Sequence, residues 1–495
     1  MKIIKYTTVI IALILTVTQC KLPDNVDPKA PTHVPVETIF TNAQLALINQ
    51  VDNNSVNLNT SRLYIQYWQQ TTYFDESRYL MIDRQIPDNY IVEFYRDALV
   101  DFKEARDVVT SPDYGADPAS RANKVAVIDI LMAYGFQACI DHFGDLPFTE
   151  ALQAQTITQP VYDDAAEVYK TLINNVGTAL VTLGADAGNG SWGTADLLYG
   201  GDDGLWRKFG ATLLLRMGMR LADVDPAASK AAVSTAISAG VFTDMSEAGY
   251  LHYSGVTPHV NDIYDSYIND GRKDYLPTNT IIDLMMDLDD PRIGLYFTKV
   301  DTAGNGNDAD FVYKGAVAGL DGAQSYQLFS QFQDVFFEPT FPAMITDYIE
   351  SEFLLAEAAA RGGYGVSDAA GHYNNAIKAS IMYWGGSEAE ADAYIASDKV
   401  AYSDAKWKEL IGTQKWLAYY NRGIEAWAEW KRLDYPQLNV AENLSYSDIP
   451  LRFVYPYNEP LQNEANLNAA IAKMSGGDKT STPVFWDVVP SPFMK

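Results

Sequence analysis

The stretch WRKFGATLLLRMGMRL at residues 206–221 decides the fold class of this chain. Its large apolar side chains recur every three or four residues, which is the spacing that places them along one face of an α-helix. These apolar positions are Trp206, Phe209, Leu213, Met217 and Leu221. Arg216 and Arg220 lie one helical turn apart on a neighbouring stripe. The stretch therefore predicts an amphipathic helix with a charged flank.

Three further segments have the same helical spacing of apolar residues. They lie at 125–139, 345–360 and 416–427. The small residues of AEAAARGG at 356–363 would let helices approach closely, as in stacked hairpins of the tetratricopeptide kind, although no fixed repeat of about 34 residues is present. We therefore predict a mostly α protein built from tetratricopeptide-like helical hairpins.

Two parts of the chain lack this periodicity. The part at about 240–342 is rich in Gly, Asp, Asn, Tyr and Phe, and the part at about 440–495 is rich in proline. Loops held on a rigid scaffold are where binding residues concentrate. We expect a single domain over 36–495, with a helical scaffold at about 36–239 and 343–435, and an irregular, loop-rich ligand-binding region in the other two parts.

Residues 1–19 have the pattern of a secretory signal peptide. Lysines precede the apolar run VIIALILTV at 9–17, which is too short to span a bilayer. The run leads into Cys20 without an A-x-A cleavage pattern, an arrangement similar to a bacterial lipobox, although Gln19 departs from the usual small residue. We predict a signal peptide at 1–19, lipidation of Cys20 and a lipidated tether at 20–35. The alternative is a plain secreted protein with an incidental cysteine.

Charge and cysteine content exclude several classes of protein. The formal net charge of −28 would repel nucleic acid and anionic membrane surfaces, so we expect neither as a partner. After the signal peptide no apolar run approaches the length of about 18 residues that a membrane-spanning helix needs. The chain has two cysteines, so lipidation of Cys20 would leave Cys139 without a disulfide partner. We expect Cys139 to be a small buried residue of a helix.

Two aromatic-rich stretches carry the side chains that a glycan site uses. Sugar rings have apolar C–H faces and hydroxyl rims, so a site for them combines aromatic rings with Asn, Gln, Asp or Arg. The stretch at 67–79 reads YWQQTTYFDESRY, and the stretch at 261–275 reads NDIYDSYINDGRKDY. The candidate ligand-binding residues are Trp68, Gln69, Tyr73, Arg78, Tyr264, Tyr267, Arg272 and Tyr275. Packing in the protein core is the alternative for each of these aromatic rings.

Signals for catalysis or for a bound metal are weak. No H-E-x-x-H, G-x-S-x-G or C-x-x-C motif occurs, and the five histidines have no metal-ligand spacing. The loop at 301–310 only loosely resembles a calcium loop, because Ala303 occupies a ligand position. We expect no catalytic residue, no cofactor and no metal. A surface glycoside hydrolase is the second hypothesis, because the 64 acidic residues offer many carboxylate pairs, and a structural or adhesive lipoprotein is the third.

Six blocks of the sequence follow one another in the order found in a known family. They are HFGDLPFTEA at 142–151, ADLLYGGD at 195–202 continuing through 206–220, DPR at 290–292, FLLAEAAARG at 353–362, QKW at 414–416 with EAW at 425–427 and RLDYP at 432–436, and IPLRFVYP at 449–456. Through these blocks the chain resembles the SusD/RagB family of nutrient-binding outer-membrane lipoproteins, and in particular its SusD-like subgroup.

The resemblance implies a fold, a partner and a role. SusD-like proteins are built on four tetratricopeptide-like hairpins and lie on the outer face of the outer membrane, anchored by a lipid. They cap a SusC-like TonB-dependent transporter and deliver an oligosaccharide or another nutrient to it. Their glycan contacts come from about the regions that correspond to 67–79 and 261–275 here. We therefore expect a binding protein for glycans that is not an enzyme; a binder of peptide or glycopeptide in the same role is the alternative.

Overall fold

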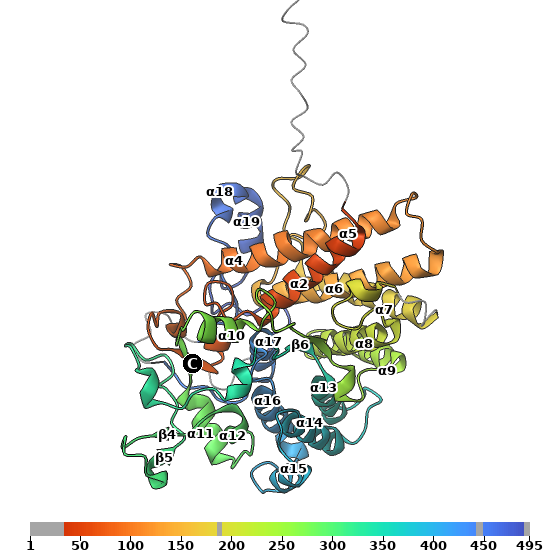
Figure 1. Cartoon of the computed structure of the whole chain (residues 1–495). Helices are drawn as coiled ribbons and strands as arrows, with labels where there is room; N and C mark the ends of the chain where they lie inside the picture. Colours follow the sequence, from red (N-terminus) through yellow and green to blue (C-terminus); the bar gives the residue numbers. More distant parts are fainter. Residues whose placement is uncertain (1–33, 186–190, 442–448, 490–495) are drawn as a thin grey trace, which may run out of the picture.

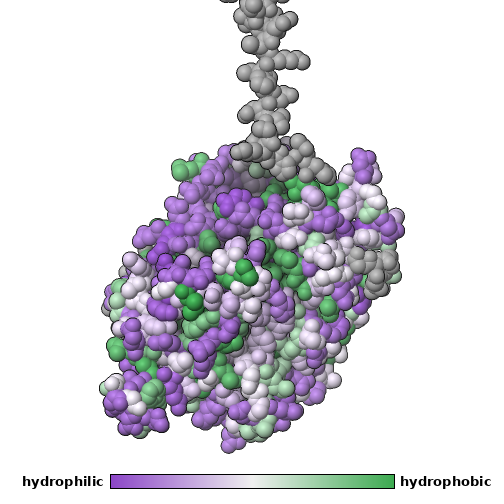
Figure 2. All heavy atoms as spheres, in the orientation of Figure 1, coloured by the Kyte–Doolittle hydropathy of each residue, from purple (hydrophilic) through white to green (hydrophobic). Residues whose placement is uncertain are grey.

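The computed structural model describes residues 34–185, 191–441 and 449–489 (Figure 1). The predicted signal peptide, Cys20 and nearly all of the predicted tether lie outside the described residues. Within them, long helices form a scaffold, and short elements and loops form a second part beside it. On the face drawn in Figure 2, hydrophilic residues cover most of the surface and apolar residues form scattered patches, as on an ordinary protein surface.

The scaffold consists of paired helices. Its elements are α2 (Val36–Asp52), α4 (Ile86–Val92), the π-helix η2 (Glu93–Leu99), α5 (Val100–Thr110), α6 (Pro118–Phe143), α7 (Ala165–Ala185), α8 (Asp203–Arg220), α9 (Pro226–Ala239), α13 (Tyr348–Arg361), α14 (Ala369–Tyr383), α15 (Glu388–Ile395), α16 (Trp407–Ala418) and α17 (Gly423–Leu433). Consecutive helices pack together as the pairs α6–α7, α8–α9, α13–α14 and α16–α17. The predicted fold class, a mostly α protein of helical hairpins, is confirmed.

Short elements and loops make up the rest of the described residues. The short helices are α3 (Ser61–Tyr64), η1 (Glu76–Arg78), η3 (Gly193–Ala195), η4 (Met245–Glu247), α10 (Asp262–Tyr264), the π-helix η5 (Asp265–Asn269), α11 (Asn279–Asp287), α12 (Ile293–Tyr296), η6 (Asp308–Asp310), η7 (Tyr326–Leu328), η8 (Asp334–Phe337), η9 (Asp404–Lys406), α18 (Glu459–Gln462) and α19 (Glu464–Ile471). Of these, η3, η4 and η9 contact the scaffold helices α2, α13 and α16. Three antiparallel pairs of strands are also present: β1 (Trp68–Gln70) with β3 (Tyr275–Pro277), β2 (Gly249–Leu251) with β6 (Ala343–Thr346), and β4 (Val300–Asp301) with β5 (Phe311–Val312).

Two of the four periodic segments differ from the helices they predicted. The segment at 345–360 begins in strand β6, and its helix starts only after Asp347, whose carboxylate accepts a hydrogen bond from the Glu350 N–H at 2.7 Å and caps the helix. The segment at 416–427 is divided between α16 and α17, because the chain turns at 419–422. A β-carbon at Gly423 would lie 2.6 Å from the Arg62 side chain, so this turn packs tightly against α3. The helical spacing of apolar residues continues across this turn because α16 and α17 both pack against the same core.

Helix α6 is the central helix of the core. One 18-residue window of it is apolar enough to cross a membrane by length and composition, although polar residues interrupt its apolar run. However, 83% of that window is buried inside the protein, so α6 is a core helix. Cys139 on this helix is fully buried, as predicted. Close packing continues at Gly210 of α8, where a β-carbon would lie 2.7 Å from Ile130 of α6.

Buried charges connect α8 to three other helices. Arg216 forms an ion pair with Glu350 of α13 at 2.5 Å. Arg220 forms ion pairs with Asp141 of α6 at 3.1 Å and with Glu425 of α17 at 2.6 Å. None of these side chains is more than 6% exposed. The charged flank that the sequence placed beside the apolar stripe is therefore inside the scaffold, where ionised groups need partners.

Candidate functional site

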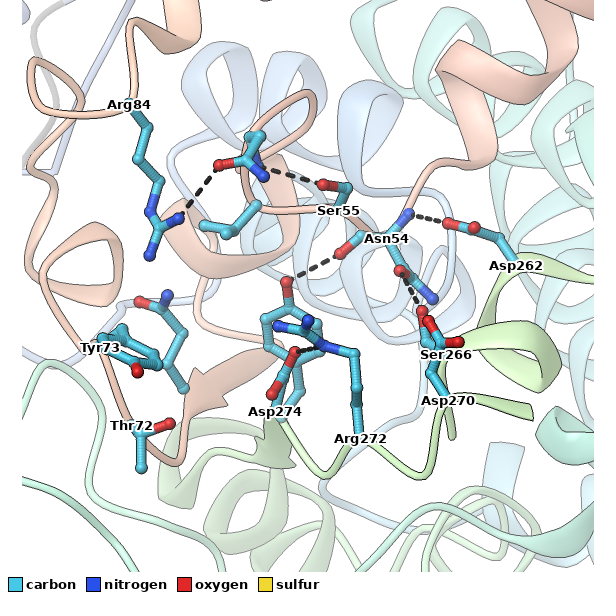
Figure 3. Close-up of a pocket in the computed structure, with 14 residues that line it drawn as sticks. Asn54, Ser55, Thr72, Tyr73, Arg84, Asp262, Ser266, Asp270, Arg272 and Asp274 are labelled. Atoms are coloured by element: carbon cyan, nitrogen blue, oxygen red, sulfur yellow. Dashed lines mark hydrogen bonds and ion pairs between the residues drawn. The ribbon is translucent and has the colours of Figure 1, made fainter. Parts of the chain in front are cut away.

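The two aromatic-rich stretches lie side by side. Strand β1 of the first stretch pairs with β3 at the end of the second, with Gln70 opposite Tyr275. Beside this strand pair is a pocket of about 240 Å³ (Figure 3). Its lining residues are Asn54, Ser55, Val56, Asn57, Gln70, Thr72, Tyr73, Arg84, Asp262, Ser266, Asp270, Arg272, Asp274 and Tyr275. The pocket is therefore built from the loop after α2, from the loop around β1 and from the α10–η5 segment.

Hydrogen bonds fix the loop after α2 against the α10–η5 segment. The Asn54 N–H donates to Asp262 at 2.7 Å, and the Tyr275 hydroxyl donates to the Asn54 carbonyl oxygen at 2.8 Å. The Ser266 hydroxyl donates to the Asn54 side-chain oxygen at 3.3 Å. These bonds converge on one residue, so the wall of the pocket is held in place before any ligand arrives.

Tyr73 is the exposed aromatic ring of the pocket. It is 74% exposed and lies at the edge of the pocket in Figure 3. Its backbone φ is 53°, in the left-handed region that a non-glycine residue rarely adopts. Backbone strain of this kind is concentrated at binding sites, where the surrounding structure maintains it. The ring is placed where a flat apolar ligand face can stack on it.

Both arginines of the pocket already have acidic partners. Arg84 donates to Glu76 at 2.5 Å and to the Asn57 side-chain oxygen at 3.1 Å. Arg272 donates to Asp274 at 2.6 Å. Burial raises the pKa of Asp262, while the Asn54 N–H and Arg62 act in the opposite direction. The polar groups of the pocket thus form a hydrogen-bonding surface that is rich in carboxylates.

The eight predicted residues divide into three groups. Tyr73, Arg272 and Tyr275 line the pocket. Arg78 and Tyr264 do not line it; Arg78 forms an ion pair with Asp321 at 2.8 Å. Trp68, Gln69 and Tyr267 form the third group and are buried.

Trp68, Gln69 and Tyr267 are buried and do not line the pocket. They are 3%, 0% and 2% exposed. The Trp68 ring lies 5.1 Å from the Tyr275 ring, and its indole N–H donates to the Tyr420 hydroxyl at 3.2 Å. The sequence did not separate these roles, because an aromatic ring that packs in a core and one that supports a sugar have the same amphipathic chemistry.

Sequence reasoning missed the wall that the loop after α2 provides. Asn54, Ser55 and Asn57 line the pocket, and so does Arg84. The signal that would have found the loop is the run DNNSVN at 52–57, a polar cluster that begins at the last residue of α2. Such a cluster marks a loop held at a helix end, which is a common position for binding residues.

Another cavity lies on the scaffold next to α14. It has a volume of about 360 Å³, and Met245, Met382, Tyr348 and Tyr383 are among its lining residues. It has no contribution from either aromatic-rich stretch. Among the described residues, no three His, Cys, Asp or Glu side chains are grouped so that they would hold a metal ion. The loop at 301–310 uses Asp301 to accept backbone hydrogen bonds from Ala303, Gly304 and Gly306.

A scaffold of helical hairpins thus carries a preformed pocket on its loops. The chain matches the SusD-like family model, described as starch-binding and associating with the outer membrane, over residues 28–456. The chain belongs to this SusD-like family, whose members are binding proteins and not enzymes.

Solved structures with the same fold cover nearly the whole chain. A chitin-binding protein is 27% identical, with a TM-score of 0.77 over 92% of this chain and 100% of that one. A chitin-binding SusD homolog from Flavobacterium johnsoniae is 22% identical, with a TM-score of 0.77 over 91% and 99%. A SusD homolog from Bacteroides thetaiotaomicron is 23% identical, with a TM-score of 0.75 over 92% and 100%. No curated protein matches the sequence.

Proposed function

We propose that this chain is a surface-exposed lipoprotein that captures glycans and delivers them to a SusC-like TonB-dependent outer-membrane transporter. The observation that carries the proposal is the pocket beside β1 and β3, with the exposed Tyr73 ring at its edge, in a chain of the SusD-like family. A sugar ring would stack its C–H face on Tyr73, and the surrounding Asn, Ser, Asp and Arg side chains would bind its hydroxyl groups.

The similar structures guide the choice of glycan. Two of them are named for chitin binding, and the family description names starch. Oligomers of N-acetylglucosamine and of α-linked glucose are therefore the first ligands to test. The pocket has room for one or two sugar units at about 240 Å³, so longer chains would extend over its rim. We infer that the bound glycan is released unchanged.

Replacing Tyr73 by alanine is expected to weaken glycan binding about threefold to tenfold. An aromatic ring contributes about 0.5–1.5 kcal/mol beyond its buried area when it stacks, and 1.4 kcal/mol is about a factor of ten in Kd. The ring is 74% exposed, so its removal leaves the core intact. Calorimetric titration of both oligomers measures the effect, with Tyr73→Phe as the matched control that keeps the ring.

Three results would contradict the glycan proposal. Equal affinities of wild type and Tyr73→Ala would show that the pocket is not the glycan site. New reducing ends, formed above a buffer control, would show that the chain hydrolyses the glycan. If peptides or glycopeptides bind in place of both oligomers, the alternative nutrient class takes the place of glycans.

The lipidation of Cys20 and the association with a transporter can be tested in bacterial membranes. We expect the full chain to be labelled by palmitate in a bacterial host and to be recovered in the outer-membrane fraction, because several acyl chains on one residue hold a protein firmly. Cys20→Ser should abolish both. After mild solubilisation from its native host, the anchored chain should be isolated together with a barrel protein. If the chain is isolated without a barrel protein, the result argues against the transporter as partner.

A further inference from the structure

We propose that the pocket selects its ligands by charge: it takes sugar units that are neutral or carry an amine, and it rejects units that carry a carboxylate or a sulfate. The inference rests on the proposed function, because it names the class of glycan for the same pocket. It follows from three features of the lining: the partners of the arginines, the number of carboxylates, and a buried amide without a partner.

Both arginines of the lining already share their charge with a carboxylate. An anionic sugar is usually held by a guanidinium group whose N–H donors are directed at the ligand. Here the Arg84 Nε donates to Glu76 at 2.5 Å, and Gln70 donates to the other oxygen of that carboxylate at 2.8 Å. The Arg272 Nε donates to Asp274 at 2.6 Å. An incoming carboxylate would have to share each guanidinium with a carboxylate that already binds it, which weakens the attraction.

Carboxylates outnumber guanidinium groups in and directly behind the lining. Asp262, Asp270 and Asp274 line the pocket, and Glu76 lies behind Arg84. The Asp270 side chain is exposed and has no hydrogen bond or ion pair with the described residues. The net charge of −28 adds to the negative potential at longer range. An anion therefore meets repulsion, whereas an ammonium group has Asp270 as a partner.

The side-chain amide of Asn54 indicates that a ligand supplies a hydrogen-bond acceptor at this wall of the pocket. Asn54 is 5% exposed, and its side-chain nitrogen has no hydrogen-bond partner among the described residues, while its oxygen accepts from Ser266. Figure 3 shows this amide on the wall of the pocket between Ser55 and Ser266. A buried donor of this kind is costly unless an acceptor meets it. A sugar hydroxyl or the oxygen of an acetamido group is a neutral acceptor, and it brings no charge toward Asp262.

The test compares a neutral oligosaccharide with its own C6-oxidised form, in which carboxylates replace the primary alcohols. At low ionic strength, about 0.02 M, we expect the oxidised form to bind at least about tenfold more weakly. At about 0.5 M salt the difference should shrink, because the Debye length falls to a few ångströms. A tetramer of glucosamine, which carries ammonium groups, should bind at least as tightly as the tetramer of N-acetylglucosamine.

Variants connect the selectivity to named side chains. Asp270→Asn should raise the relative affinity for the oxidised form several-fold, and Asp274→Asn should do the same because it frees Arg272. The matched control is Asp398→Asn, which replaces an exposed carboxylate after α15 that does not line the pocket. Equal or tighter binding of the oxidised form by wild type, or an unchanged ratio in both pocket variants, would overturn the inference. If no glycan of any charge binds, it is the proposed function that fails.

Discussion

Replacement of Glu350 by alanine is expected to lower the free energy of unfolding by about 3–5 kcal/mol, the typical cost of removing one partner from a buried ion pair. The Glu350 side chain is fully buried. It accepts hydrogen bonds from Arg216 at 2.5 and 2.8 Å, from the Thr346 hydroxyl at 3.1 Å, and from Arg422. It thus connects α13 to α8 and to the residue that precedes α17.

The cost arises from the arginines that remain. Arg216 and Arg422 are 1% and 7% exposed in these pairs, so water cannot replace the lost carboxylate. Arg216 would retain Glu425 at 3.4 Å and Arg422 would retain Asp347 at 3.2 Å, which limits the effect to the range given. A change of this size is a large share of the total stability of a domain.

Urea unfolding followed by circular dichroism measures this change. The matched control is Glu167→Ala, which removes an exposed ion pair with Lys170 at 2.8 Å on α7. Exposed pairs of this kind contribute about 0–1 kcal/mol, so the control should unfold almost as wild type does. A loss below about 1 kcal/mol for Glu350→Ala would mean that the buried pairs are no stronger than surface pairs.

The sequence predicted the scaffold because its signal is local. Helical periodicity depends on residues three and four positions apart, and α6 and α8 follow directly from it. Local periodicity could not identify the ion-pair partners of Arg216 and Arg220, because Glu350 and Glu425 are distant from them in the sequence. Charged residues on a helix face are usually solvated, and only the tertiary packing shows that these are enclosed.

The sequence indicated the region of the pocket but not which of its residues line the pocket. The two aromatic-rich stretches were selected by composition, and the pairing of β1 with β3 brings them together. Composition does not fix the direction of a side chain. In adjacent residues of one strand, Gln70 lines the pocket whereas Gln69 lies in the core, because successive side chains of a strand point to opposite faces. Tyr73 lies after the strand, and a left-handed backbone turns it outward.

Acid is expected to weaken the wild-type protein more than a variant in which Glu357 is replaced by glutamine. Glu357 is fully buried on α13, and it accepts hydrogen bonds from Arg432 at 2.5 Å and from Arg361 at 2.7 Å. Burial alone would raise the pKa of Glu357, but the guanidinium groups of Arg432 and Arg361 outweigh it and hold the pKa well below its ordinary value.

The sign of the pH dependence follows from this lowered pKa. In the unfolded chain a glutamate takes up its proton near pH 4.3, whereas Glu357 in the folded protein stays ionised to much lower pH. Its stabilising contribution is therefore complete above about pH 5 and is lost progressively as the pH falls, by up to about 1.4 kcal/mol for each pH unit. Glutamine does not titrate, so Glu357→Gln lacks this loss.

Urea unfolding at pH 5 and at pH 3 tests the difference. Between these values wild type should lose about 1–2 kcal/mol more than Glu357→Gln. The variant is less stable at both because the buried Arg432 and the partly buried Arg361 lose a charged partner. Both proteins contain the same other carboxyl groups, so the pH dependence of those groups cancels in the comparison. Asp52 is one of them: burial raises its pKa to about 7, so its contribution to stability changes with pH in the opposite direction. Glu388→Gln, in an exposed pair with Lys378 at 3.0 Å, should follow the wild-type profile. Parallel profiles for wild type and Glu357→Gln would mean that Glu357 titrates alike in the folded and unfolded chains, and that its two arginines do not hold it ionised.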